Sequence, residues 1–129
     1  RLVAAVQRAL AACPPDVATL IVNNEEHSIH IQPRNEDAAG VEISYWGTDE
    51  IYLCVGMTDS WIWDGPAGSV EQELYQILAG VMAGRFEEAG SFNAGGRVQA
   101  PRGEIRFGGS PVIPLPWRWR HRHTYPPYA

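Results

Sequence analysis

The chain has 129 residues, of which 45% are hydrophobic and 19% are charged, and its formal net charge at pH 7 is −5. That length fits a single domain with one core, and the hydrophobic fraction excludes disorder over most of the chain. No apolar run approaches the ~20 residues of a membrane-spanning helix, so we expect no membrane partner.

The first half of the chain has the pattern of one helix followed by several short strands. Residues 2–12 repeat apolar positions at helical spacing, and Pro14 and Pro15 end that helix. Short runs of alternating apolar and polar residues then lie between polar turns, which is typical of half-buried strands. We predict strands at 19–22, 28–32, 41–46 and 51–55, with a further short piece at 61–63.

A second helix is the most distinct element of the sequence. Ser69 has the character of an N-cap, and Gln72 stands three residues later, as in a capping box. Gly84 falls where a left-handed C-terminal cap is expected. Gly80, inside the helix, costs about 1 kcal/mol in helix propensity, which the close approach of a strand explains. The apolar stripe consists of Val70, Leu74, Ile77, Leu78, Val81 and Met82.

The remaining residues complete an α+β pattern. Residues 97–107 read as a hairpin with its turn at Pro101 and Gly103. We therefore predict one curved, mainly antiparallel sheet with two helices packed on it, in the order helix, four or five strands, helix, two strands. Residues 1–110 form this single domain. Residues 111–129 form an extended C-terminal tail, rich in proline, tryptophan and arginine, that packs on the domain as a strap or edge strand.

The tail alternates strictly between two kinds of side chain. Its odd positions are Ile113, Leu115, Trp117, Trp119, His121 and His123, and its even positions are Pro114, Pro116, Arg118, Arg120 and Arg122. Such a segment is extended, with an aromatic face and a cationic face. It either packs on the domain or docks onto a partner's sheet edge. We do not expect a nucleic-acid arm, because three arginines are few and the rest of the chain is acidic.

The histidines and glycines do not form a recognisable cofactor or metal motif. His121 and His123 share a face of an extended chain, but no third ligand is evident. His27 and His30 lie on opposite faces of a strand. The glycine-rich stretches lack the spacing of a phosphate-binding loop. We predict neither a cofactor nor a metal.

A catalytic set is also missing from the sequence. Adjacent acids such as Glu87 and Glu88 fall in expected turns or helix ends, where solvated charge is normal. A nucleophile pair of Cys54 and His27 can be drawn, although a small buried thiol is the ordinary reason for a cysteine in a strand. We predict that the protein is not an enzyme. A small enzyme or ligand-binding domain with a pocket near Cys54 and His27 is retained as an alternative.

The segment around residues 59–64 is the best candidate for an interface. Trp61 and Trp63 alternate with Ile62, so the two rings share a face that is either core or surface. A surface pair between Asp59 and Asp64 suits a basic partner. The predicted partner-binding residues are Trp61, Trp63, Asp59, Asp64, Trp117 and Trp119.

The small size, acidic charge and order of elements resemble the immunity proteins of bacterial polymorphic toxin systems. All ten basic residues are arginine, which is typical of a GC-rich bacterial genome. The resemblance implies a non-enzymatic inhibitor that binds a basic toxin, or another basic secreted protein, in the bacterial cytoplasm. It includes no motif, so no family site residues are carried over.

The order of elements is also similar to type III secretion chaperones and YbjN-like domains. That resemblance implies a dimer that holds a partner segment. The sequence lacks their final helix and ends in the proline-rich tail instead. The choice between monomer and homodimer is left open.

Overall fold

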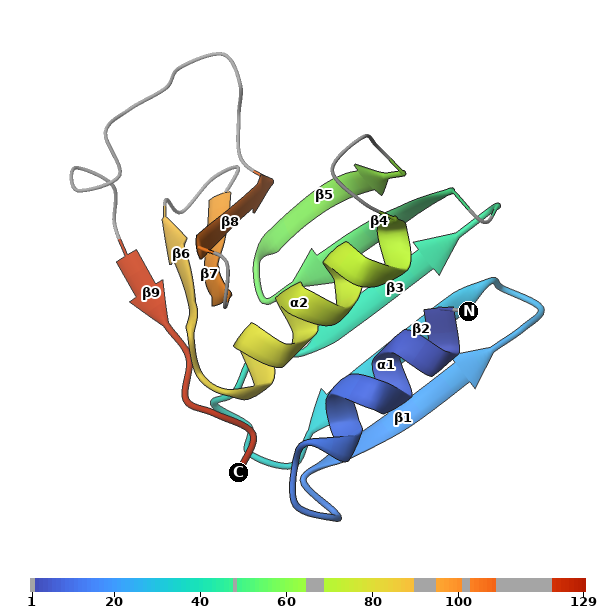
Figure 1. The fold of residues 1–129 in the computed structure, drawn as a ribbon. Helices are drawn as coiled ribbons and strands as arrows, with labels where there is room; N and C mark the ends of the chain where they lie inside the picture. Colours follow the sequence, from blue (N-terminus) through green and yellow to red (C-terminus); the bar gives the residue numbers. More distant parts are fainter. Residues whose placement is uncertain (1, 48, 65–68, 90–94, 101–102, 109–121) are drawn as a thin grey trace.

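The computed structural model describes residues 2–47, 49–64, 69–89, 95–100, 103–108 and 122–129 (Figure 1). Its elements in chain order are α1 (Leu2–Ala11), β1 (Ala18–Asn23), β2 (Ser28–Pro33), β3 (Val41–Tyr45), β4 (Glu50–Val55), β5 (Thr58–Trp63), α2 (Val70–Met82), β6 (Phe86–Ala89), β7 (Gly95–Ala100), β8 (Gly103–Gly108) and β9 (Arg122–Thr124). Within these ranges, no helix has the length and apolar character needed to cross a bilayer.

The strands form two antiparallel sheets. The first has the order β1-β2-β3-β4-β5, and the second has the order β8-β7-β6-β9. Helices α1 and α2 lie side by side on one face of the five-stranded sheet (Figure 1). The predicted α+β fold, with two helices and antiparallel strands, is confirmed. The strands divide into two sheets, where the sequence suggested one, because β6 pairs with β7 and β9 and not with β5.

The core lies between the five-stranded sheet and the two helices. Alternate residues of β2 to β5 point toward the helices and are buried, as period-two packing requires. The buried residues of the helices complete the same cluster. The largest fully buried side chains are Phe86, Ile29, Ile31, Ile43, Ile51, Leu53, Leu74, Ile77, Leu78, Val6, Val41 and Val55.

Helix α2 begins and ends where the sequence predicts. The Ser69 side chain accepts a hydrogen bond from the Gln72 N–H at 3.3 Å, so the predicted N-cap is confirmed. Gly84 has φ +77°, and its N–H donates to the Val81 carbonyl. The next N–H, of Arg85, donates to the Gly80 carbonyl at 2.8 Å. These two bonds form a Schellman motif, which confirms the left-handed cap.

Gly80 allows the second sheet to pack directly on α2. A Cβ placed on Gly80 would lie 1.9 Å from Cγ2 of Val98 in β7. No real side chain tolerates such a contact, so glycine is required by the approach of the strand. The expected close contact at Gly80 is therefore confirmed, and β7 is the strand that makes it.

Strand β6 is the element that sequence analysis missed. Its sequence, Phe86–Ala89, contains two acids, and both were expected to be solvated in a turn or helix end. That expectation is wrong for Glu88, whose side chain is only 2% exposed. Glu87 points the other way and pairs with Arg97 at 3.1 Å.

The Glu88 carboxylate joins the two sheets. It accepts hydrogen bonds from the Met57 N–H at 2.9 Å and the Thr58 hydroxyl at 2.6 Å, both at the turn between β4 and β5. The Tyr125 hydroxyl donates to its other oxygen. Burial, and then the hydrogen bond to Glu88, raises the pKa of Tyr125. Gly56 leaves room for this group, because a Cβ there would lie 2.7 Å from the carboxylate.

The C-terminal residues pack against the domain. Strand β9 pairs with β6, and Tyr128 is buried, with its hydroxyl donating to the Ala39 carbonyl at 2.6 Å. The Tyr128 N–H also donates to the carbonyl of Met82 at the end of α2. Trp117, Trp119 and His121 lie outside the described residues.

We expect Gly80→Ala to lower the free energy of unfolding. Overpacking costs about 1–3 kcal/mol, and a contact of 1.9 Å with Val98 indicates the upper part of that range, above the ~1 kcal/mol that alanine gains in helix propensity. Urea unfolding of the wild type, Gly80→Ala, Val98→Ala and the double variant measures the coupling. The loss caused by Gly80→Ala should shrink in the Val98→Ala background. A Gly80→Ala protein as stable as the wild type would contradict this packing.

Glu88→Gln should cost about 1.5–3 kcal/mol of stability, because it replaces buried hydrogen bonds to a charged group with weaker neutral ones. Glu87→Gln is the matched control, since it changes the neighbouring residue on the exposed side of the same strand. Its loss should stay within about 1 kcal/mol, the usual range of a surface ion pair. Thermal and urea unfolding of both variants tests the difference, and equal losses would show that Glu88 has no special role.

Candidate protein-binding surface

The face of the five-stranded sheet that points away from the helices, here called the open face, carries a cluster of aromatic rings. Four residues, here called the aromatic patch, form it: Trp46, Tyr52, Trp61 and Trp63. The pairing of β4 with β5 sets Tyr52 beside Trp61, with ring centroids 5.0 Å apart. Trp46 follows β3 and lies 5.4 Å from Trp61, and Trp63 stacks at 6.2 Å. Trp61 is therefore the centre of the patch.

The tryptophans of the patch are open to solvent. Exposed fractions are 65% for Trp46, 42% for Trp61 and 57% for Trp63, while Ile62 between the last two is buried in the core. The alternative that Trp61 and Trp63 are core residues is therefore wrong. Large exposed aromatic clusters are uncommon on monomeric proteins and generally mark binding surfaces.

Three acids share the open face with the aromatic patch. Glu42, Asp59 and Glu50 project from β3, β5 and β4 on the same side as the rings. The indole N–H of Trp63 donates to Glu50 at 2.7 Å, and the Tyr52 hydroxyl donates to Asp59. The sequences of β1 to β5 contain no arginine and no lysine. The open face therefore combines exposed rings with negative charge.

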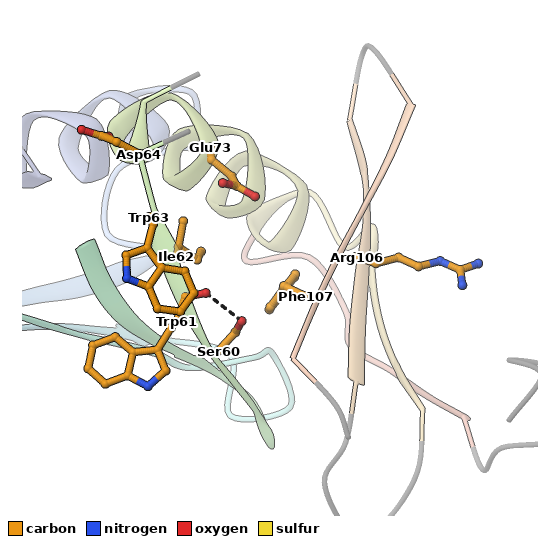
Figure 2. Close-up of a pocket in the computed structure, with 8 residues that line it drawn as sticks. All are labelled: Ser60, Trp61, Ile62, Trp63, Asp64, Glu73, Arg106 and Phe107. Carbon is orange, nitrogen blue, oxygen red and sulfur yellow. Dashed lines mark hydrogen bonds between the residues drawn. The ribbon is translucent and has the colours of Figure 1, made fainter. Parts of the chain in front are cut away.

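Asp64 lies apart from this surface. It points to the helix side of β5, where its carboxylate accepts a hydrogen bond from the Val70 N–H at 2.7 Å, at the first residue of α2 (Figure 2). A carboxylate at this position also interacts favourably with the helix dipole. The structure thus brings Asp59, Trp61 and Trp63 together and gives Asp64 a capping contact instead.

A cleft of about 350 Å³ adjoins the aromatic patch between β5, α2 and β8. Its lining combines the edge of β5 with Glu73 of α2 and with Arg106 and Phe107 of β8, and the Arg106 side chain extends away from Phe107 (Figure 2). Partial burial raises the pKa of Glu73. The cleft therefore brings apolar residues, Ile62 and Phe107, together with the acidic Glu73 and the basic Arg106.

The alternative site near Cys54 and His27 lacks the features of a nucleophile pair. Cys54 lies on the open face, and the residues opposite it on β3 and β5 are Glu42 and Asp59. Burial, followed by the charges of these acids, raises the pKa of the Cys54 thiol. A raised pKa disfavours the reactive thiolate. His27 lies in the turn before β2 and contacts Tyr45 edge to face.

No metal-binding cluster of three or more His, Cys, Asp or Glu side chains exists within the described ranges. His123 packs edge to face on Tyr125 at 4.5 Å, and His30 is exposed on the open face. His121, which the sequence analysis paired with His123, lies outside the described residues. His27 and His30 belong to the hairpin of β1 and β2, whereas His123 belongs to β9 of the second sheet.

Comparison of the chain with protein-family models, curated proteins and solved structures finds no match. Sequence analysis identified Trp61 and Trp63 but left out Trp46 and Tyr52. The alternation at 41–46 already set Trp46 on the polar side of its strand. The register that brings Trp46 and Tyr52 to Trp61 was not visible in the sequence.

We expect the Asp59 contact to control the ionisation of Tyr52. The hydrogen bond to Asp59, then desolvation and the Asp59 charge, raises the pKa of Tyr52 to about 12. Asp59→Asn should return this pKa toward the ordinary value of about 10. Tyrosinate absorbance, taken as the difference from a matched Tyr52→Phe protein, reports the shift.

Glu50→Gln, which alters the acid that accepts a hydrogen bond from Trp63, is the control and should leave the pKa of Tyr52 unchanged. The pKa of Tyr52 in the folded protein lies above its value in the unfolded chain. The contact with Asp59 therefore contributes its full stabilisation of the fold below about pH 10, and this contribution is lost as the pH rises through about 12. An unaltered Tyr52 titration in Asp59→Asn would contradict this contact.

Proposed function

We propose that the protein is a non-enzymatic binding module that recognises a basic protein through the aromatic patch and its acidic neighbours. The observation that carries this proposal is the exposure of three contacting tryptophans on a sheet whose five strands contain no arginine. Tryptophan is among the residues most enriched in the energetic centres of interfaces. Glu42, Glu50 and Asp59 supply negative charge around these rings.

The chemistry of the patch favours arginine as the group recognised. A guanidinium stacks on an indole face and pairs with a carboxylate at the same time, which an ammonium does less well. The rings of Trp61 and Trp63 are roughly parallel, with 20° between their planes, and both side chains are exposed, which suits the stacking of a planar group from solvent. Asp59 and Glu50 lie at the margins of these rings.

The patch is also held in place before a partner arrives. Hydrogen bonds fix Trp63 on Glu50 and Tyr52 on Asp59, and both strands belong to one antiparallel sheet. Ordering fewer side chains on association lowers the entropic cost of binding. The adjoining cleft, with Glu73 on its wall, provides a place for a further basic or apolar side chain that passes over the edge of β5.

A toxin-immunity or inhibitor role in the bacterial cytoplasm is the biological form of this proposal. Such an inhibitor needs a rigid acidic surface and no chemistry of its own. The acidic balance of the whole chain speeds association with a basic target. Cys13 and Cys54 are free thiols, which fits a reducing compartment.

A peptide of alternating arginine and serine tests the recognised chemistry directly. We expect it to bind the wild type, and we expect the same peptide with citrulline in place of arginine to bind at least about tenfold more weakly, because citrulline keeps the shape and loses the charge. Trp61→Ala should weaken binding by about tenfold or more.

Met57→Ala is the matched control for this variant, since Met57 is a large exposed apolar residue at a turn outside the patch. It should bind as the wild type does. Calorimetry or anisotropy at low and moderate salt gives the affinities. Equal binding of the arginine and citrulline peptides, no binding of either, or an unaffected Trp61→Ala protein would each reject the proposal.

Affinity capture from the native cell extract then identifies the target. A basic protein should be retained by the wild type and by Met57→Ala and lost with Trp61→Ala. With the purified target, Asp59→Arg should slow association and reduce its dependence on salt.

A further inference from the structure

Among the residues that the structure describes, the two sheets have four edge strands, β1, β5, β8 and β9, and β1 lacks the usual protection of an edge. Strand β8 carries Glu104 and Arg106, β9 has only three residues, and β5 carries Asp59. Strand β1, Ala18–Asn23, contains no charged residue and no proline. Its exposed apolar residues include Ile21 at 47% and Val22 at 37%. Natural proteins avoid a long, apolar, uncharged edge unless another strand covers it.

The hydrogen-bond phase of β1 identifies the groups at its free edge. The Arg34 N–H donates to the Val17 carbonyl at 2.8 Å, which marks this pair as hydrogen-bonded. Hydrogen-bonded pairs recur at every second residue, so Thr19, Ile21 and Asn23 also form backbone hydrogen bonds with β2. The backbone groups of the alternate residues therefore point outward from the sheet; these residues are Ala18, Leu20 and Val22.

We propose that β1 pairs antiparallel with β1 of a second copy of this chain, with Leu20 on the two-fold axis. Leu20 then faces its own copy, and Ala18 faces Val22 of the second copy. All three outward residues find partners, which gives about six intermolecular backbone hydrogen bonds. A register centred on Ile21 instead sets Ala18 against the turn at Asn24, outside the strand.

The side chains support the same register. Leu20 already packs on the core on the helix side, and its copy extends that apolar layer across the axis. On the open face, Ile21 lies beside Thr19 of the second copy, so an exposed isoleucine gains a β-branched neighbour. No charges oppose each other, because β1 has none. Such self-complementarity is what a two-fold interface requires.

This pairing makes one continuous ten-stranded sheet from two five-stranded ones. The aromatic patch stays free, because its residues lie on β4, on β5 and directly after β3, whereas β1 is at the opposite edge of the sheet. Both patches would face the same side of the assembly, so the dimer presents two binding surfaces in parallel. The dimer itself does not depend on what the patch binds.

Sedimentation velocity over a range of concentrations tests the dimer, with the double variant Thr19→Lys/Ile21→Lys as the probe. Both side chains point to solvent in the monomer, so folding is unaffected, but lysines would oppose each other across the axis. The wild type should sediment as a concentration-dependent dimer and the variant as a monomer. The matched control is His30→Lys/Gln32→Lys, which adds the same charges to the same rows one strand inward and should remain dimeric.

Charge reversal provides a rescue that a merely destabilised fold would not show. Thr19→Glu/Ile21→Glu should be monomeric alone and should form a heterodimer when mixed with the lysine variant. Amide exchange by NMR gives a further measurement. In the wild-type dimer the N–H groups of Ala18, Leu20 and Val22 should be protected, and in the lysine variant they should exchange rapidly.

A wild type that stays monomeric at every concentration would overturn the proposal. So would a lysine variant that still dimerises, or a mixture of the two charged variants that does not associate. Because binding to the arginine peptide is measured separately, failure of the dimer leaves the proposed function of the patch intact, and the reverse also holds.

Discussion

The buried carboxylate of Glu88 is the interaction on which the arrangement of the two sheets depends. Its oxygens accept hydrogen bonds from the turn between β4 and β5 and from Tyr125 near the C-terminus. A buried carboxylate without such donors would be strongly unfavourable. The second sheet is therefore held at one position beside β5 and α2, and a displacement of either sheet would leave this group without its partners.

In the part of the chain that the structure describes, that arrangement leaves the open face of the five-stranded sheet without a helix. Both helices lie on the other face, and Gly80 lets β7 approach α2 from the side. The buried residues of β2 to β5 thus face one way only, and period-two alternation turns every second side chain outward. The exposure of Trp46, Trp61 and Trp63 follows from this one-sided packing.

The sequence predicts the elements of this fold better than their assembly. Periodicity identified α2, and the character of Ser69, Gly80 and Gly84 located its caps and its contact with a strand, because these are local constraints. Alternation showed that Trp61 and Trp63 share a face. It did not show which face is outside, since that depends on where the helices pack.

Long-range pairing explains what the sequence did not predict. Glu88 resembles a solvated acid in a short polar stretch, and only its contacts with Thr58, 30 positions before it, and Tyr125, 37 positions after it, make burial favourable. The aromatic patch likewise joins residues from three segments by strand register. The open face and the edge of β1 share one cause: among the described residues the helices lie on one face of the sheet only, which leaves the other face and one edge without a covering element (Figure 1). Acids and tryptophans make the open face suitable for a basic partner, whereas the uncharged apolar sequence of β1 makes its edge suitable for pairing with a second copy of the chain.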